Sequence, residues 1–385
     1  MLKLTYTLNM QTEQILWKKE TGWSTQNAST MNGQANLVFA FGGIDVIASE
    51  DVLKELKSRY NNAHIIMAST AGEIHGNMVF DDSVSVTACS FEHTKLKVIK
   101  IAVGEFNSSF ACGEAIRQQL ASSDLNHILI FSDGISVNGD ELVRGVNHEL
   151  PSDVIVTGGL AADAGRFSKT FVGADALPAP DQIVAIGFYG NRLQVNHGSQ
   201  GGWDVFGPVR KVTRSEGNVL YELDGEGALE IYKRYLGARA AELPGSALLF
   251  PLCILGENSK TQLVRTILSI DENEGSMKFA GNIPNGASVQ FMMANFDRLV
   301  DGAAQAAEMS LTDSQPDLVM MISCVGRKIV LDQRVEEEVE SVCSVFGDKA
   351  AFTGFYSNGE ISPLMNTVGC SLHNQTMTIT TYKEV

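Results

Sequence analysis

The chain has 385 residues, of which 44% are hydrophobic and 19% are charged, and its formal net charge is −16 at pH 7. Acidic residues outnumber basic ones by 45 to 29, and no cluster of Lys and Arg offers a surface for a phosphate backbone. The composition predicts a soluble globular protein of two or three domains and argues against nucleic acid or an anionic membrane as a partner.

Neither a signal peptide nor a membrane span is expected. The first 20 residues alternate between polar and apolar side chains, without the continuous apolar core of a signal peptide. The longest apolar run, 247–255, is too short to cross a bilayer and contains Pro251. The six cysteines show neither a CxxC pair nor zinc-ligand spacing, so we expect reduced thiols in a cytoplasmic protein.

The first predicted unit is a strand, a helix and a second strand. NLVFAFGG (36–43) is an apolar strand that ends in glycine, and EDVLKELKSRY (50–60) has one apolar helical stripe. HIIMASTAGEI (64–74) is a second strand that closes in the small-residue turn STAGEI, residues 69–74.

Two further units have the same order. HILIFSDG (127–134) leads into a helix at 138–150, where Asn138 and Glu141 resemble a capping box, and then into DVIVTGGLAADAG (153–165). DLVMMISCVG (317–326) leads into a helix at 334–346 and a strand at 351–361 that closes in YSNGEI. We expect the units at 36–74, 127–160 and 317–361 to share their strand and helix order, with parallel strand pairs.

Short strands and one helix are predicted between these units. Residues 83–91, 95–104, 182–190 and 192–198 alternate with hairpin spacing and predict antiparallel sheet. A helix at 225–237, with Asp224 as N-cap and Gly237 at its end, marks the domain boundary. The predicted fold is α/β with α+β elements: repeated strand-helix-strand units in two closely packed sheet-containing domains, residues 1–222 and 223–385.

The repeated turn has two interpretations. Glycine at a strand end lets a ligand approach the backbone, and Glu73 or Glu360 places a carboxylate there. With Gly158 and Gly159 of the TGGLAAD segment, these turns are predicted to face a shared cleft. Alternatively, each Glu accepts hydrogen bonds from its own turn and each Gly only provides backbone freedom.

Five segments together resemble the FIST (F-box and intracellular signal transduction) family. They are STAGEI (69–74), TGGLAADAGRFSKTFVG (157–173), the long stretch from His197 to Gly237, SCVGRK (323–328) and GFYSNGEISP (354–363). The resemblance implies an N-terminal and a C-terminal FIST domain that form a small-ligand sensor. Because the chain leaves no room for an output domain, it also implies a stand-alone sensor that acts through a partner.

Within that family the chain looks like the stand-alone nitric-oxide-sensing haem proteins (NosP), chiefly through HGSQGGW. This implies haem b and regulation of a histidine kinase or cyclic-di-GMP enzyme. His197 is the first candidate for the axial ligand and metal site, because a Gly-rich loop gives it free approach and Trp203 and Phe206 provide an aromatic wall. The alternative is a neutral His hydrogen-bonded into that loop.

No catalytic constellation is found, so the chain is not expected to be an enzyme. GNIPNGAS (281–288) has P-loop glycine spacing but lacks the phosphate-binding Lys. A hydrolase that uses Ser357 or Asp163 is the last-ranked of three function hypotheses, after the haem sensor and a haem-free sensor. The second hypothesis is therefore a haem-free FIST sensor of an amino acid or similar metabolite, with Glu73, Glu360 and Arg214 as charge partners. The sequence leaves homo-oligomer formation open.

Overall fold

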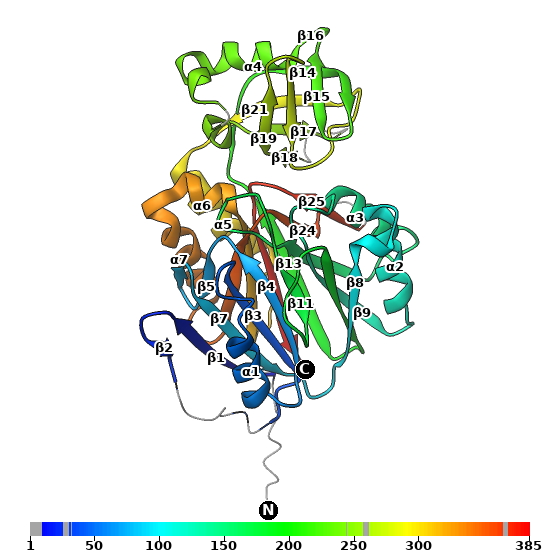
Figure 1. Cartoon of the computed structure of the whole chain (residues 1–385), viewed down its shortest axis with the longest axis vertical. Helices are drawn as coiled ribbons and strands as arrows, with labels where there is room; N and C mark the ends of the chain where they lie inside the picture. The colour runs from blue at the N-terminus through cyan, green and yellow to red at the C-terminus, as the bar shows by residue number, and fades with distance from the viewer. Residues whose placement is uncertain (1–9, 26–30, 32, 244, 257–261, 365–368) are drawn as a thin grey trace, which may run out of the picture.

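The computed structural model describes residues 10–25, 31, 33–243, 245–256, 262–364 and 369–385. Residues 1–9, part of the segment judged not to be a signal peptide, lie outside this set. Figure 1 shows a larger body, which contains three six-stranded sheets, and a smaller unit above it around a fourth sheet. No helix of the described residues is long and apolar enough to cross a membrane. The fold is mixed α/β, as predicted.

The body consists of three repeats. The first contains β1 (Gln11–Lys18), β2 (Gly22–Trp23), β3 (Leu37–Gly43), α1 (Glu50–Arg59), β4 (His64–Thr70), β5 (Glu73–His75), β6 (Met78–Phe80) and β7 (Val84–Ser90). The second contains β8 (Lys95–Ala102), η1 (Val103–Glu105), α2 (Ser109–Leu120), β9 (Leu125–Ser132), α3 (Gly139–Asn147), β10 (Ile155–Leu160), β11 (Val172–Ala174) and β12 (Gln182–Tyr189).

The third repeat begins with β13 (Leu193–Gln200) and resumes after the fourth-sheet unit. Its later elements are α5 (Phe296–Met309), β22 (Leu318–Cys324), α6 (Val325–Leu331), η4 (Asp332–Arg334), α7 (Val335–Phe346), β23 (Ala351–Ser357), β24 (Gly359–Pro363), β25 (Cys370–His373) and β26 (Met377–Glu384). The fourth-sheet unit is thus an insertion between β13 and α5.

The predicted units share their order in the structure. In each repeat two strands, β3 and β4, β9 and β10, or β22 and β23, pair in parallel and are joined through helix. The parallel strands and the shared order of the three units are confirmed. The third unit differs in one detail, because α6 and η4 precede the predicted helix, which begins at Val335.

Each repeat gives one or two strands to the sheet of another repeat: the first gives β5 and β6, the second gives β11, and the third gives β24 and β25. The first sheet has the order β11-β4-β3-β7-β1-β2, the second β25-β24-β10-β9-β12-β8 and the third β13-β26-β22-β23-β5-β6. The strand β5 of the first repeat therefore lies beside β23, β24 of the third beside β10, and β11 of the second beside β4. The exchange is cyclic, so one edge of every sheet is formed by one or two strands from another repeat.

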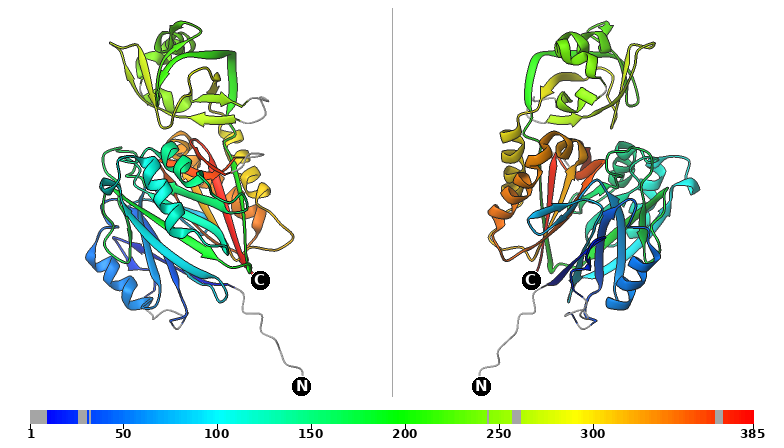
Figure 2. Two further views of the ribbon diagram at one scale, coloured as in Figure 1. Left: turned by 90° about the vertical axis from the view of Figure 1, so that its right-hand side faces the viewer. Right: turned by 60° about the vertical axis from the view of Figure 1, so that its left-hand side comes forward.

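The inner faces of the three sheets meet in one core. Phe131 of the second repeat lies 6.0 Å from Phe39, 5.5 Å from Phe41 and 6.0 Å from Phe355, measured between ring centroids. These rings come from β9, β3 and β23, one strand of each sheet. Figure 2 shows the helices on the outside of the body, where their apolar stripes cover the other faces of the sheets.

The hairpins predicted between the units are wrong. The strands β7 and β8 belong to the first and second sheets, and β12 and β13 to the second and third. Their pairing is antiparallel as predicted, but each connection crosses from one sheet to the next instead of folding back. Both faces of β7 and β12 are buried, so neither strand has a solvent-exposed face of the kind expected for a surface hairpin.

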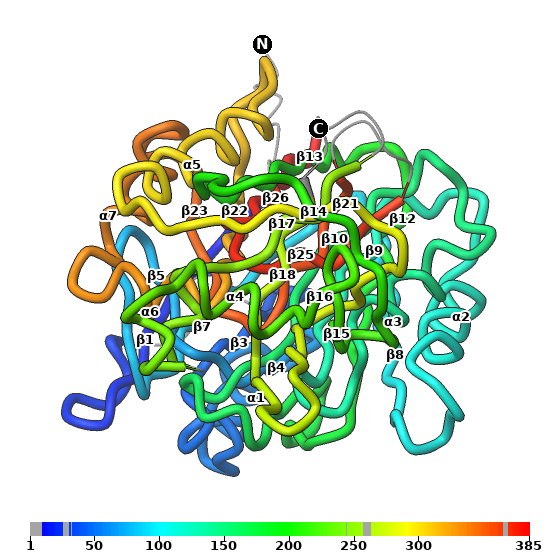
Figure 3. The backbone as a smooth tube through the Cα atoms, turned by 90° about the horizontal axis from the view of Figure 1, so that it is seen from above, coloured from blue at the N-terminus to red at the C-terminus, as the bar shows by residue number. Residues whose placement is uncertain are grey.

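The inserted unit has its own core. It contains β14 (Asp204–Glu216), β15 (Val219–Leu223), β16 (Glu226–Gly227), α4 (Ala228–Leu236), η2 (Gly237–Glu242), η3 (Gly245–Leu249), β17 (Leu252–Leu255), β18 (Gln262–Arg265), β19 (Ile267–Asp271), β20 (Ser276–Phe279) and β21 (Ser288–Met293). Seen from above in Figure 3, it lies over the body.

The helix predicted at 225–237 is α4, and Gly237 ends it with a φ of 57°. Its N-cap is Gly227, so the assignment of Asp224 as N-cap is wrong. Asp224 instead accepts hydrogen bonds from the backbone of Lys211, at 2.8 Å, and from the guanidinium of Arg210. The boundary predicted between 222 and 223 falls within β15, whereas the compact inserted unit spans residues 204–293.

Replacing Phe131 by Ala should destabilise all three repeats at once. The buried ring contacts phenylalanines of the other two sheets, and truncating a buried Phe to Ala typically costs about 3–5 kcal/mol. Urea unfolding should give one transition at a lower midpoint for Phe131→Ala, while Phe167→Ala, whose residue is 43% exposed, should leave the midpoint within error. Separate transitions for parts of the body would contradict the shared core.

Candidate functional site

A cavity lies where the inserted unit meets the body. It has a volume of about 830 Å³ and is called here the junction cavity. Its walls come from the end of β13 and the following loop, one face of α5, the inserted unit, and the segments around β24 and β25. The lining residues are Ser199, Gln200, Gly201, Gly202, Trp203, Val264, Met292, Arg298, Asp301, Gln305, Glu308, Met309, Pro363, Leu364, His373 and Thr376.

Two glycines let the loop after β13 approach α5. A side chain at Gly202, which has a φ of 77°, would place its Cβ 1.9 Å from the carbonyl oxygen of Arg298. On the α5 side, Gly302 faces the backbone of Gly201 with a Cβ distance of 3.0 Å. Trp203 is then fixed by a hydrogen bond of 2.8 Å from its indole nitrogen to the carbonyl oxygen of Gln375.

A fully buried ion pair holds these segments together. Arg327 of α6 donates two hydrogen bonds to Glu338 of α7, at 2.9 and 2.7 Å, and neither side chain is exposed. The guanidinium also donates to the backbone carbonyls of Gly201 and Leu299. Since a buried guanidinium needs all its donors satisfied, Arg327 fixes the loop after β13 relative to the start of α5.

The two GEI turns have the same hydrogen-bond geometry. Thr70 donates its hydroxyl to Glu73, which also accepts from the backbone and hydroxyl of Ser83 at 3.1 and 2.7 Å. Ser357 donates to Glu360 at 2.8 Å, and Glu360 also accepts two hydrogen bonds from Thr376.

Both glutamates are fully buried within their own turns. Burial raises the pKa of Glu73 to about 7 and that of Glu360 to about 8, against the lowering effect of the donated hydrogen bonds. The geometry agrees with the alternative in which each Glu accepts hydrogen bonds from its own turn.

The second repeat provides an internal comparison for this geometry. Glu73 pairs with Phe355 and Glu360 with Gly159, and the corresponding exchanged strand pairs Val172 with Ala68. The second repeat therefore has Val172 at the position of the glutamates. Ala161, two residues after Gly159, occupies the position of Thr70 and Ser357 in the other turns. The second repeat thus lacks both the hydroxyl and the carboxyl group, which indicates that these two groups function as a hydrogen-bonded pair.

The three turns are neighbours, but they do not line the junction cavity. The backbone of Ala71 bonds to Tyr356, that of Asn358 to Leu160 and that of Ala162 to Ser69, at 2.9, 3.1 and 2.9 Å. A Cβ at Gly158 would lie 2.0 Å from the carbonyl oxygen of Ile130, and one at Gly159 would lie 2.7 Å from Ile322. These glycines allow close packing, and the predicted shared cleft is not formed by Glu73, Glu360, Gly158 and Gly159.

Arg214 lies apart from these turns, on β14 of the inserted unit. Its guanidinium is 3.6 Å from Glu222 and stacks on Tyr221, at 4.3 Å from the ring centroid. Asp163 accepts hydrogen bonds from the backbone of Phe167, Ser168 and Lys169 and so closes its own loop. The hydroxyl of Ser357 donates its hydrogen bond to Glu360.

The residues predicted to hold a haem are not brought together. Trp203 lines the junction cavity, but Phe206 packs in the core of the inserted unit, 5.9 Å from Tyr235. His197 lies on β13 outside the cavity lining, with a buried Nδ1 that has no hydrogen-bond partner and a pKa that burial lowers.

The cavity itself does not suit a haem. The imidazole of the cavity-lining His373 is engaged by the carbonyl of Ser362 through its Nε2, and charged side chains of α5 form one wall. These residues do not fit a haem held by His197 in this cavity. Among the described residues no group of three or more His, Cys, Asp or Glu side chains could hold a metal ion.

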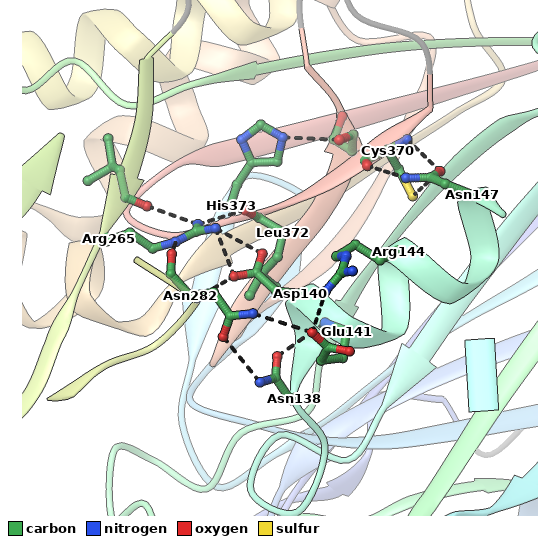
Figure 4. Close-up of polar contacts among 12 residues, drawn as sticks. Asn138, Asp140, Glu141, Arg144, Asn147, Arg265, Asn282, Cys370, Leu372 and His373 are labelled. Carbon is green, nitrogen blue, oxygen red and sulfur yellow. Dashed lines mark hydrogen bonds and ion pairs between the residues drawn. The ribbon is translucent and has the colours of Figure 1, made fainter. Parts of the chain in front are cut away.

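A second buried ion pair joins the inserted unit to the body. Arg265 of β18 is 2% exposed and donates to both carboxylate oxygens of Asp140 on α3, at 2.8 and 2.9 Å. It also donates to the backbone carbonyl of Leu372, at 2.9 Å, next to His373 (Figure 4). Asn282, from the glycine-spaced segment 281–288, lies beside the same carboxylate, so that segment forms part of the interface.

Sequence reasoning missed the residues that build the cavity. It assigned no helix at 296–309, although Arg298, Asp301, Gln305 and Glu308 recur every three or four residues and share one helix face. It also treated SCVGRK only as a resemblance motif, whereas Arg327 is the buried cation that fixes the cavity wall.

Comparison with known proteins covers most of the chain. Residues 36–226 match the FIST N domain and residues 228–363 match the FIST C domain. A protein of Methanocaldococcus jannaschii, described as uncharacterized protein MJ1623, is 24% identical over 234 residues. That alignment covers 56% of this chain and 44% of the other protein, so the chain spans less than half the length of this relative.

Replacing Glu360 by Gln should remove a pH dependence of stability. The folded protein keeps the Glu360 proton to about pH 8, while the unfolded chain releases it near the ordinary pKa of 4.5. The free energy of unfolding therefore falls as the pH rises through this range. Urea unfolding at pH 5.5 and 8 should show a gain of Glu360→Gln over wild type that grows with pH.

The matched control is Glu340→Gln, which changes an exposed carboxylate on α7 and should leave the pH dependence unaltered. Glu360→Ala should be less stable at both pH values, because Ser357 and Thr376 lose their acceptor. Equal pH dependence of wild type and Glu360→Gln would contradict the raised pKa.

Replacing Asp140 by Ala should loosen the inserted unit. The change leaves the buried guanidinium of Arg265 without its counter-ion, which typically costs about 3–5 kcal/mol. Proteolysis and urea unfolding should show an early loss of protection in residues 204–293. Glu272→Ala, which breaks the exposed pair with Lys233, should cost less than about 1 kcal/mol. Equal effects of the two variants would show that Arg265 does not fix the interface.

Proposed function

Because the chain belongs to the family of proteins with FIST N and FIST C domains, we propose that it is a sensor in signal transduction that holds a small polar ligand in the junction cavity. The observation that carries this proposal is the composition of the cavity wall. Val264 and Met292 come from the inserted unit, whereas Ser199, Asp301 and His373 come from the body. A ligand in this cavity touches both parts.

A ligand that touches both parts can shift their relative position. Binding changes a conformational equilibrium only when the ligand contacts the two states differently, and a cavity between two bodies meets that condition. The volume of about 830 Å³ is within the range of metabolite sites. The wall also combines apolar side chains with a few polar groups, as such sites do. This favours the haem-free hypothesis, with an amino acid or similar metabolite as ligand.

The output is proposed to be a change of contact with a separate signalling enzyme, a histidine kinase or a cyclic-di-GMP enzyme. This partner follows from the family resemblance. We assign no reaction to the chain itself. A nitric oxide sensor with haem b is the competing proposal, and the unpartnered Nδ1 of the half-buried His197 is the one observation in its favour.

Thermal unfolding with a panel of amino acids, amines and organic acids tests the proposal. At least one compound should raise the midpoint of wild type in proportion to the logarithm of its concentration. Gln305→Trp places an indole from the exposed face of α5 into the cavity and should abolish the shift. Lys54→Trp, an equal change on the exposed face of α1, should retain it.

Two outcomes would overturn the cavity as the sensor site. One is a panel that gives no shift with wild type. The other is a shift that persists in Gln305→Trp. A Soret band in protein supplied with haem, lost in His197→Ala but retained in His64→Ala and His148→Ala, would support the gas-sensor hypothesis instead.

A further inference from the structure

The free polar groups of the junction cavity are mainly hydrogen-bond acceptors. Asp301 and Glu308 lie on the cavity face of α5, both are exposed, and neither has a hydrogen-bond or ion-pair partner among the described residues. The one cation among the described lining residues, Arg298, forms an ion pair with Asp204. The cavity therefore has two carboxylates that no cation of its wall neutralises.

His373 of β25 adds a neutral acceptor to the cavity wall. The residue is 4% exposed, and its Nε2 lies 3.0 Å from the carbonyl oxygen of Ser362. Since a carbonyl only accepts hydrogen bonds, Nε2 carries the proton and Nδ1 has a free lone pair. Figure 4 shows Nδ1 on the side of the ring away from this bond. Burial lowers the pKa of His373 to about 4, so the ring is uncharged at pH 7.

Thr376, like His373, offers a ligand a hydrogen-bond acceptor. Its hydroxyl donates to Glu360 at 2.9 Å, so the proton is used and only lone pairs remain for a ligand. Trp203 contributes an indole ring, which attracts cations, and Met292 and Met309 contribute apolar surface. Two carboxylates, two acceptors, an aromatic ring and thioethers together suit an alkyl chain that ends in a hydrogen-bond donor with positive charge.

We propose that the junction cavity selects an organic cation with a primary ammonium group on an alkyl chain, such as a diamine or a basic amino acid. This inference rests on the proposed function and names its ligand class. Asp301 and Glu308 neutralise the charge, and the acceptors of His373 and Thr376 receive N–H groups. An anionic ligand is disfavoured, because it would face both carboxylates with no free cation in the described wall.

Isothermal titration with three probes of similar length tests this selectivity. The probes are 1,5-diaminopentane, 1,5-pentanediol and glutarate, which present two ammonium groups, two hydroxyls and two carboxylates, respectively. Wild type should bind the diamine and should bind the other two at least tenfold more weakly. The double variant Asp301→Asn/Glu308→Gln should lose the diamine affinity by at least tenfold, and it should fold normally because both carboxylates are exposed.

Non-specific attraction of an amine to an acidic chain is controlled by a second double variant. Glu340→Gln/Asp348→Asn removes two exposed carboxylates near α7 and should leave diamine binding unchanged. Equal losses in the two double variants, or tighter binding of pentanediol or glutarate, would overturn the inference while leaving the sensor proposal in place. Failure of every probe and every panel compound would overturn both.

Discussion

The cyclic exchange of strands is the constraint on which the rest of the body depends. One edge of each sheet is formed by strands of another repeat: β11 in the first sheet, β24 and β25 in the second, and β5 and β6 in the third. A strand edge leaves backbone donors and acceptors unpaired, so no sheet satisfies its hydrogen bonds without the neighbouring repeat. The phenylalanine core has the same property, because its rings come from all three sheets. Stability is therefore a property of the complete ring of repeats.

The turns show how the exchange is achieved chemically. A chain that leaves one sheet and enters the next must bury polar groups at the crossing point. In the first and third repeats a buried glutamate side chain accepts three hydrogen bonds from hydroxyl and backbone groups there. In the second repeat a longer loop closed by Asp163 replaces this arrangement. Glu73 and Glu360 thus stabilise the crossings between sheets.

Local pattern predicted the repeats well and the assembly poorly. The apolar strands, the helical stripes and the matching turns were sufficient for three units of equal order. The exchange could not be predicted, because hydrophobic periodicity reports which face of a strand is buried and not which sheet receives it. For the same reason β7 and β8 resembled a hairpin.

The junction cavity could not be predicted from the sequence for a different reason. The junction cavity combines α5, which follows the insertion, with the end of β13, which precedes it. Nearly one hundred residues separate these walls, and the buried contacts of Arg327 help to bring them together. A buried arginine in a helix has no mark in single-sequence patterns that distinguishes it from a solvated one. The polar face of α5 likewise cannot be told, from the sequence alone, from an ordinary solvated helix face.

The direction of the exchange also sets an order for synthesis on the ribosome. The first sheet receives β11 when residue 174 has been made, so it closes early. The second sheet waits for β24, which lies almost at the C-terminus, and until then β10 presents an open edge with Gly158 and Gly159 in it. Glycine is a weak former of intermolecular sheet, so this edge is a poor template for pairing between nascent chains during the delay.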